Sequence, residues 1–191
     1  MTNIERENKR LLDIVDENDN IIGAESRAKV HHLGLLHREV HVWMFSGDKG
    51  VIFQKRGLHR PSAGLLDATA GGHINKGEDY LKAAIRETKE ETGLSIPATD
   101  LIFLKKFKGT SSQSGESLGG TINHFIRAVY IYKNPVDESS IKKETGIPGG
   151  GFQKLSYEFL TNLNQLQKDS LEMFDNLIVS EEIAPVLQYI K

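Results

Sequence analysis

Three glutamates lie close together in a stretch with helical character. Glu87, Glu90 and Glu91 are three and four residues apart, so on a helix they project from one side. Like charges at this spacing repel by only about 0.2–0.5 kcal/mol per pair, so repulsion alone does not require a counter-ion. Taken by themselves, the three residues are more typical of a solvated charged helix. They are also ligands that Mg²⁺ prefers, usually together with substrate phosphates, so the cluster is a candidate metal site.

Further residues at fixed distances make the pattern specific. Arg86 has the (i, i+4) spacing for a pair with Glu90 and lies about two turns from Glu78, so it could orient either carboxylate. Each of the seven positions matches by chance roughly once in 15 residues, so the probability of a complete match at any starting point in the chain is about one in a million. The positions are Gly72, Glu78, Arg86, Glu87, Glu90, Glu91 and Gly93. The complete pattern therefore favours metal-assisted chemistry over a solvated helix.

The stretch resembles the Nudix box over residues 72–94: Gly, five residues, Glu, seven residues, Arg-Glu, an aliphatic residue, any residue, Glu-Glu, any residue, Gly and an aliphatic residue. The resemblance implies a Nudix-type α/β/α sandwich with a mixed central sheet. It also implies a metal-dependent hydrolase that cleaves a diphosphate linkage in a nucleoside-diphosphate-linked or similar small molecule.

The same resemblance implies roles for individual residues. Mg²⁺ or Mn²⁺ would be held by Glu90, Glu91 and often Glu87, assisted by the backbone carbonyl of Gly72. In the alternative role, Glu87 orients or deprotonates the attacking water. We expect Arg86 to act with these three glutamates in catalysis, and we expect structural roles for the box residues Glu78 and Gly93.

A helix must position these carboxylates, and residues 78–92 have that character, with Gly93 as a C-terminal cap. Its apolar positions, Leu81, Ala84, Ile85 and Thr88, predict a face that packs on a sheet, opposite the glutamates. Thr88 departs from the box, which usually has an aliphatic residue here. We expect its methyl group to pack and its hydroxyl to bond the preceding turn.

The rest of the chain alternates apolar stretches with polar turns and predicts a mixed sheet covered by helices, in a single Nudix domain spanning residues 1–191. Predicted strands are 11–15 and 21–24 (within a hairpin, 11–25), 37–46, 51–55, 101–107 and 121–133; predicted loops are 56–64, 109–120 and 134–151; C-terminal helices are expected within about 156–191, at 159–166 and 185–190. Trp43 is expected in the core.

Substrate contacts are expected outside the box. Arg56 and Arg60 belong to a basic stretch that could receive phosphates, since Arg offers a bidentate fork, although solvated surface charge explains it equally well. Related enzymes often use a carboxylate from a later loop. We expect Glu144 in that role, with Glu116, Asp137 and Glu138 as the other candidates.

A second resemblance is to the Nudix branch that includes isopentenyl-diphosphate isomerases. Those enzymes bind a metal partly through histidines, and His37 and His73 match such positions, whereas His31 and His32 are off by one. The isomerases also need a cysteine where this chain has Gly71, and the chain contains no cysteine. Isomerase activity is therefore disfavoured. For His37 and His41 we expect a hydrogen-bonded structural role rather than metal binding.

The composition bears on which ligands, metal sites and cellular locations are expected. The 24 basic and 26 acidic residues give a net charge of −2, so no general field for a nucleic acid polymer is expected. Without cysteine, disulfides and thiolate metal sites are excluded. No apolar run is long enough for a membrane span, and the polar N-terminus does not resemble a signal peptide, so a cytoplasmic location is expected. A homodimer is possible. A non-catalytic nucleotide-binding module stays as an alternative, which the intact box disfavours.

Overall fold

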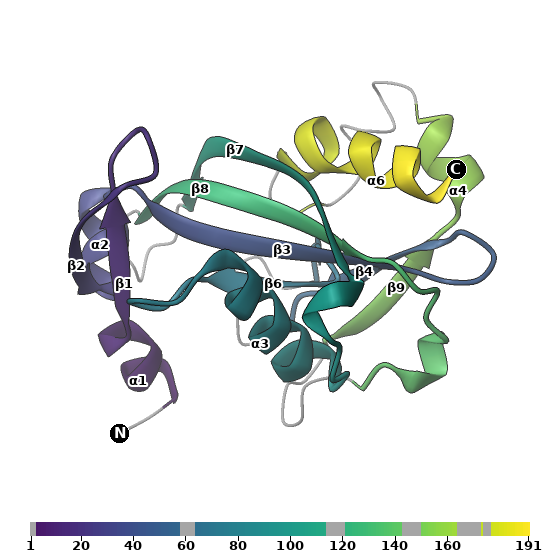
Figure 1. Ribbon diagram of the computed structural model, residues 1–191, viewed down its shortest axis with the longest axis horizontal. Helices are drawn as coiled ribbons and strands as arrows, with labels where there is room; N and C mark the ends of the chain where they lie inside the picture. Colours follow the sequence, from purple (N-terminus) through teal and green to yellow (C-terminus); the bar gives the residue numbers. More distant parts are fainter. Residues whose placement is uncertain (1–2, 58–63, 114–120, 143–149, 164–172, 174–176) are drawn as a thin grey trace.

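A nine-stranded mixed sheet forms the centre of the part of the chain that the structure describes. This computed structural model describes residues 3–57, 64–113, 121–142, 150–163, 173 and 177–191 (Figure 1). The strands are β1 (Leu11–Val15), β2 (Ile21–Ser26), β3 (His37–Phe45), β4 (Val51–Lys55), β5 (Leu66–Asp67), β6 (Ala70–His73), β7 (Leu101–Gln113), β8 (Thr121–Tyr132) and β9 (Gly151–Leu155). The helices are α1 (Asn3–Lys9), α2 (Arg27–Leu33), α3 (Tyr80–Thr92), α4 (Tyr157–Thr161) and α6 (Ile183–Ile190), with the 3-10 turns η1 (Ala98–Asp100) and η2 (Glu138–Ser140) and the π-helical segment η3 (Ile178–Glu182).

Strand β3 is the central strand of this sheet. It pairs in parallel with β8 and antiparallel with β1, β4 and β6, while β8 continues into a long antiparallel hairpin with β7. Strand β4 pairs antiparallel with β5 and β9. The sheet is therefore mixed and mostly antiparallel, and the predicted α/β class is confirmed.

The two faces of β3 meet different helices. Successive side chains of a strand point to opposite faces. Val40 and Val42 pack with Ala83 and Ala84 of α3, whereas Trp43 lies in the cluster that includes residues of α6. Figure 1 shows α3 and α6 on opposite sides of the long strands β3 and β8. This two-sided covering is why β3 is apolar at almost every position from Val40 onward, and it places Trp43 in the core as predicted.

Buried charges lie on the α6 face of β3. Glu182, the last residue of η3, is fully buried and accepts hydrogen bonds from His41, Trp43 and Arg127 at 2.8–3.1 Å. Arg127 of β8 also donates to Glu39, its register partner on β3. Burial alone would raise the pKa of Glu182, but the charges of His41 and Arg127 and the hydrogen bonds of His41 and Trp43 lower it to about 2. At this position of the core, the buried Glu182 is therefore stabilised by its charged partners and not by apolar packing.

Most predicted elements are present, with boundaries shifted by one or two residues, but the short strands β5 and β6 were not predicted and three further features differ. Residues 109–113, predicted as loop, continue β7 and pair with β8 as far as Gln113. Backbone hydrogen bonds hold this polar end of the hairpin. Its sequence does not alternate apolar and polar residues, so it was not predicted as a strand. The predicted helix at 159–166 is described only as α4, which ends at Thr161. Helices α1 and α2 were not predicted, and only Val30 is buried in α2.

Among the described helices, none combines the length and the hydropathy needed to cross a bilayer.

Replacing Glu182 by Gln should destabilise the fold by about 3 kcal/mol, because it leaves the buried cations His41 and Arg127 without this carboxylate. Urea unfolding measures the change. Glu181→Gln is the matched control: Glu181 forms a partly exposed pair with Lys105, so its loss should cost at most about 1 kcal/mol. Equal stability of the two variants would contradict the assigned role.

The pH dependence provides a second readout of the same carboxylate. Because the folded state lowers the pKa of Glu182 from 4.5 to about 2, its contribution to stability is full above about pH 4.5 and is lost as the pH falls toward 2. The Glu182→Gln variant should therefore lose stability less steeply over this acidic range than the wild type. Parallel acid profiles for the two proteins would show that Glu182 is not responsible.

Candidate active site

The ends of α3 are fixed by local interactions. Asp79 precedes the helix and its side chain accepts the backbone N–H of Lys82 at 2.8 Å. Gly93 ends the helix in the left-handed region, with φ of 74°, and its N–H donates to the carbonyl of Lys89. The predicted helix and its glycine cap are therefore confirmed. These two caps set which residues of α3 face β6.

Gly72 of β6 allows α3 to approach the sheet closely. A Cβ atom on Gly72 would overlap the carboxylate of Glu87 and lie 2.7 Å from its Cδ. The N–H of Gly71 donates to Glu91 at 2.9 Å. Glu87 and Glu91 are each only 6% exposed, whereas the side chain of Glu90 is 56% exposed. A side chain at Gly72 would prevent this arrangement, because its Cβ atom would occupy the position of the Glu87 carboxylate.

The predicted separation of an apolar face from a carboxylate face was therefore wrong in part. Glu87 and Glu91 lie on the side of α3 that packs against β6, together with Ala84 and Thr88, and Glu90 alone of the three glutamates is exposed. The reason is that Gly72 leaves space for the Glu87 carboxylate and the backbone N–H of Gly71 donates to Glu91, so this side accepts carboxylates in place of apolar side chains. The site is thus a partly buried carboxylate cluster at the edge between helix and sheet.

Arg86 orients the carboxylates. Its Nε and Nη2 donate to the two oxygens of Glu78 at 2.9 and 2.8 Å, and its Nη1 donates to Glu87 at 2.6 Å and to Glu90 at 3.3 Å. Nη2 also donates to the carbonyl of His73 on β6. Although burial opposes it, the hydrogen bond from Arg86 lowers the pKa of Glu78. The predicted pairing of Arg86 with both Glu78 and Glu90 is confirmed, and it extends to Glu87.

Glu87 is the buried carboxyl group of the site with a raised pKa. Burial raises its pKa to about 7, even though the adjacent Arg86 acts in the opposite direction. A carboxyl group that titrates near neutral pH can accept a proton from water, or it can lose its proton on binding a cation. The carboxylates of Glu87, Glu90 and Glu91 provide hard oxygen donors that fit Mg²⁺ or Mn²⁺. The donor set is therefore suited to such an ion.

Thr88 fits the packing prediction and departs from the hydrogen-bond prediction. It is fully buried, but its Oγ1 makes no hydrogen bond within the described residues. The hydroxyl that does bond a preceding turn is that of Thr92, which donates to the carbonyl of Thr88. The expectation for the Thr88 hydroxyl was therefore wrong.

The structure describes only part of the predicted substrate contacts. The guanidinium of Arg56 pairs with the carboxylate of Asp67 at 2.8 Å. Asp137 caps η2 through the N–H of Ser139, and Glu138 pairs with Lys154 at 2.7 Å. In these contacts Asp137 and Glu138 stabilise the turn around η2. Three other candidates, Arg60, Glu116 and Glu144, lie outside the described residues.

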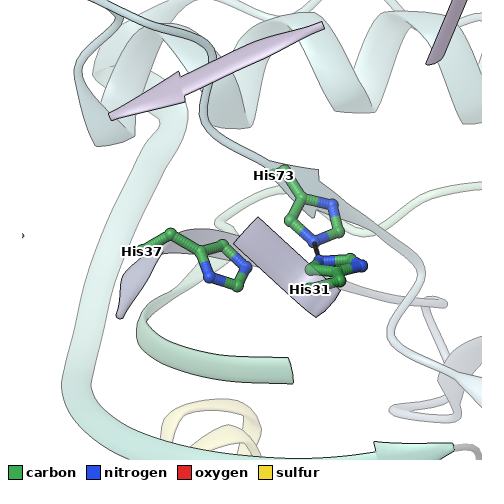
Figure 2. Close-up of side chains that lie close together, drawn as sticks. All are labelled: His31, His37 and His73. Carbon is green, nitrogen blue, oxygen red and sulfur yellow. Dashed lines mark hydrogen bonds between the residues drawn. The ribbon is translucent and has the colours of Figure 1, made fainter. Parts of the chain in front are cut away.

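Three histidines lie close together on the sheet face opposite α3, although it was not predicted from the sequence that they form a cluster. His31, His37 and His73 place ring nitrogens within 4.8 Å of one another (Figure 2). His31 had been set aside because it was off by one residue. The helix that supplies it, α2, had not been predicted. His41 has the hydrogen-bonded role expected of it, through Nδ1 and Glu182.

Comparisons with known proteins agree with this geometry. An uncharacterized Nudix hydrolase from Clostridium acetobutylicum is 33% identical over 136 residues, which cover 69% of this chain and 63% of that protein. An isopentenyl-diphosphate Δ-isomerase from Serratia proteamaculans is 28% identical over 179 residues, covering 89% of this chain and 98% of the isomerase. The chain thus spans less than two thirds of the Clostridium relative.

A solved structure from Deinococcus radiodurans shares the fold, with a TM-score of 0.61, 20% identity, and coverage of 91% of this chain and 97% of that one. The Nudix domain of a Shewanella oneidensis protein, solved in complex with ADP ribose, has a TM-score of 0.53 at 15% identity and covers 82% of this chain and 88% of that one. A model of the NUDIX domain family matches residues 35–176, which include the whole carboxylate site. The chain therefore belongs to the Nudix family, whose hydrolases are generally metal-dependent and act on pyrophosphate bonds.

Proposed function

We propose that this chain is a Mg²⁺- or Mn²⁺-dependent hydrolase that cleaves a diphosphate linkage in a nucleoside-diphosphate-linked or similar small molecule. The observation that carries the proposal is the arrangement of Glu87 above Gly72, held by Arg86, with Glu90 and Glu91 beside it on the same helix. Among the other fixed positions of the box, Glu78 holds Arg86, which orients Glu87 and Glu90, and Gly93 ends the helix that carries them.

The residues that would hold the ion are Glu90, Glu91 and Glu87, with the carbonyl of Gly72 as a further oxygen donor. A divalent ion bound there would offset charge on the diphosphate and lower the pKa of a bound water. Glu90 is the most exposed of the three carboxylates and faces solvent, from which a diphosphate would approach.

Glu87 has two possible roles, as a metal ligand and as the base that accepts the proton of the attacking water. Its pKa of about 7 suits either. Arg86 acts as a positioning residue in both, because its Nη1 fixes one Glu87 oxygen while its Nε and Nη2 are held by Glu78. The water attack itself is at phosphorus, and the phosphate leaves with the bonding electrons of the broken anhydride bond.

An isopentenyl-diphosphate isomerase is the second candidate, because the Serratia relative matches nearly the full chain. The position of the expected cysteine argues against it. Gly71 stands there, and a Cβ atom on Gly71 would lie 2.5 Å from Cδ2 and 3.2 Å from Nε2 of His41. The His41 ring thus fills the space that a cysteine side chain would need, and Glu182 holds that ring in place.

The substrate, the cytoplasmic location and a homodimer stay predictions from the sequence. The sequence predicts that the chemical group attached to the diphosphate is selected by the segments 56–64, 109–120 and 134–151, of which 58–63, 114–120 and 143–149 lie outside the described residues.

Glu90→Gln should lower turnover at least about 100-fold, on the scale of losing one charged contact at a transition state. The fold should be kept, because the Glu90 side chain is 56% exposed. The measurement is Mg²⁺-dependent release of phosphate or a monophosphate from nucleoside diphosphate sugars, dinucleoside polyphosphates, NADH, CoA and nucleoside triphosphates. Glu91→Gln should have the same effect, although Glu91 is buried.

The matched control is Glu158→Gln, the same change at an exposed residue of α4 outside the box and outside the predicted substrate segments, which should leave turnover unchanged. Wild-type turnover in Glu90→Gln and Glu91→Gln would contradict the proposed metal role. Binding of a compound from this panel without turnover of any would favour the non-catalytic module.

Gly72→Ala tests the close approach of α3 to β6. The added methyl group must displace the Glu87 carboxylate, so we expect a loss of about 1–3 kcal/mol in the free energy of unfolding and a large drop in turnover. Gly47→Ala is the control, because a Cβ atom there meets no heavy atom within 4 Å and should change stability by less than about 0.5 kcal/mol. Indistinguishable behaviour of the two variants would contradict the role of Gly72.

Isopentenyl diphosphate separates the two candidate enzymes. Incubation with the wild-type protein and divalent metal, followed by proton NMR, should show no allylic product, because Gly71 carries no side chain to take part in proton transfer. Formation of the allylic isomer at a catalytic rate would favour the isomerase over the hydrolase.

A further inference from the structure

The segment that joins α1 to β1 lies beside the start of the box. The backbone N–H of Lys76 donates to the carbonyl of Leu11 at 2.9 Å, and the N–H of Asn75 donates to the side chain of Glu78 at 3.0 Å. Figure 1 shows this end of β1 next to the segment that runs from β6 to α3. Arg10, which directly precedes Leu11, is therefore held close to the box by backbone pairing.

The guanidinium of Arg10 has a donor that the fold does not use. Its Nε is buried and makes no hydrogen bond within the part of the chain that the structure describes. Its Nη1 pairs with Glu7 at 3.5 Å, and the side chain of Glu7 is 49% exposed. An ion pair that is long and exposed is weak, whereas a buried donor without an acceptor is costly. A ligand that brings an oxygen to the Nε side of Arg10 would therefore be favoured.

The charge of Arg10 acts on side chains of the site. Burial raises the pKa of Glu87, and the charge of Arg10 is one of those that lower it. Burial lowers the pKa of His73, and the charges of Arg27 and Arg10 lower it further. Such effects decrease with distance, so the guanidinium of Arg10 lies near both Glu87 and His73. The N–H of Arg27 donates to the carbonyl of Arg10 at 2.8 Å, so positive charge from two arginines reaches this side of the site.

A guanidinium in this place suits an anion that binds beside the cation of the box. A diphosphate carries more negative charge than one divalent ion offsets, so a further cationic contact would stabilise it. The Nε–H and one Nη–H of an arginine point in parallel and match two oxygens of one phosphate. In Arg10 this edge of the guanidinium contains the buried donor that lacks an acceptor among the described residues.

We propose, resting on the proposed hydrolysis of a diphosphate, that Arg10 binds the substrate by donating from Nε and one Nη to a phosphate of the diphosphate. Glu7 holds the guanidinium until the phosphate takes its place. The family model matches residues 35–176, so Arg10 lies outside it. The contact is therefore provided by the N-terminal segment of this chain and is separate from the fixed positions of the box.

Binding of methylenediphosphonate, a diphosphate analogue that is not hydrolysed, tests the contact on the full-length protein with saturating Mn²⁺. By calorimetry, Arg10→Ala should bind the analogue at least about 10-fold more weakly than the wild type, on the scale of losing hydrogen bonds to a charged group. Arg10→Lys keeps the charge without the fork, so its affinity should lie between the two. Arg6→Ala is the matched control: Arg6 is an exposed arginine of α1, and its loss should leave binding unchanged.

The affinity for Mn²⁺ alone separates a phosphate contact from a structural role. Arg10→Ala removes a positive charge near Glu87, so it should bind Mn²⁺ as tightly as the wild type or more tightly. A variant with a distorted site would bind both Mn²⁺ and the analogue more weakly. With a substrate of the panel, Arg10→Ala should raise KM at least about 10-fold and change kcat less, because the contact is made in the ground state as well as in the transition state.

Three results would overturn the inference: no binding of the analogue by the wild type with Mn²⁺, equal affinity of Arg10→Ala and Arg6→Ala for the analogue, or a parallel loss of Mn²⁺ and analogue affinity in Arg10→Ala. Where the alanine variant does not fold, Arg10→Gln replaces it, with the same expected weakening. If no compound of the panel is turned over but Arg10→Ala still weakens analogue binding alone, the hydrolase is contradicted and the phosphate contact is supported.

Discussion

The close approach of side chains to both faces of β6 is the constraint on which the rest of the site depends. Gly72 leaves room on one face for the Glu87 carboxylate, and Gly71 leaves room on the other for the ring of His41. Because neither residue has a Cβ atom, a helix carboxylate and a strand imidazole can both lie against the backbone of one short strand. Helix α3, the arginine that orients its carboxylates and the buried charges around Glu182 are arranged around this strand.

The two faces differ in their chemistry. On the α3 face, Glu87 and Glu91 are packed against glycine backbone, and Arg86 provides the compensating charge at close range. On the opposite face, Glu39 and Glu182 are buried and paired with Arg127, and His41 adds to the pairing. Burying a charge is costly unless it is paired and hydrogen-bonded, so each face contains its own complement of opposite charge. Carboxylates therefore lie on both faces, paired with Arg86 on the α3 face and with Arg127 and His41 on the other.

The sequence was sufficient to predict the residues of the box and their helix, because fixed spacing translates directly into positions on α3 and into the cap at Gly93. It was also sufficient for the partners of Arg86, which lie within two helical turns. The burial of Glu87 and Glu91 was not predictable in this way. It depends on which strand lies beneath the helix, and the register that places Gly72 there is a long-range property.

The histidine cluster shows the same limit. His37 lies on a strand that the sequence predicted, but His73 lies on β6, a strand of four residues that was not predicted. His31 lies on α2, which has a single buried residue and no apolar periodicity to reveal it. The end of β7 was missed for a related reason, since residues 109–113 are held by backbone pairing alone. Tertiary contacts, rather than local patterns, decide these elements.

The most direct test of the central claim is the location of Mn²⁺ in a crystal of the wild-type protein grown with that ion, from its anomalous scattering. A peak between the carboxylates of Glu87, Glu90 and Glu91 and the carbonyl of Gly72 is the predicted result. A fully soaked crystal with an accessible α3 and no anomalous density at these four residues would contradict the account.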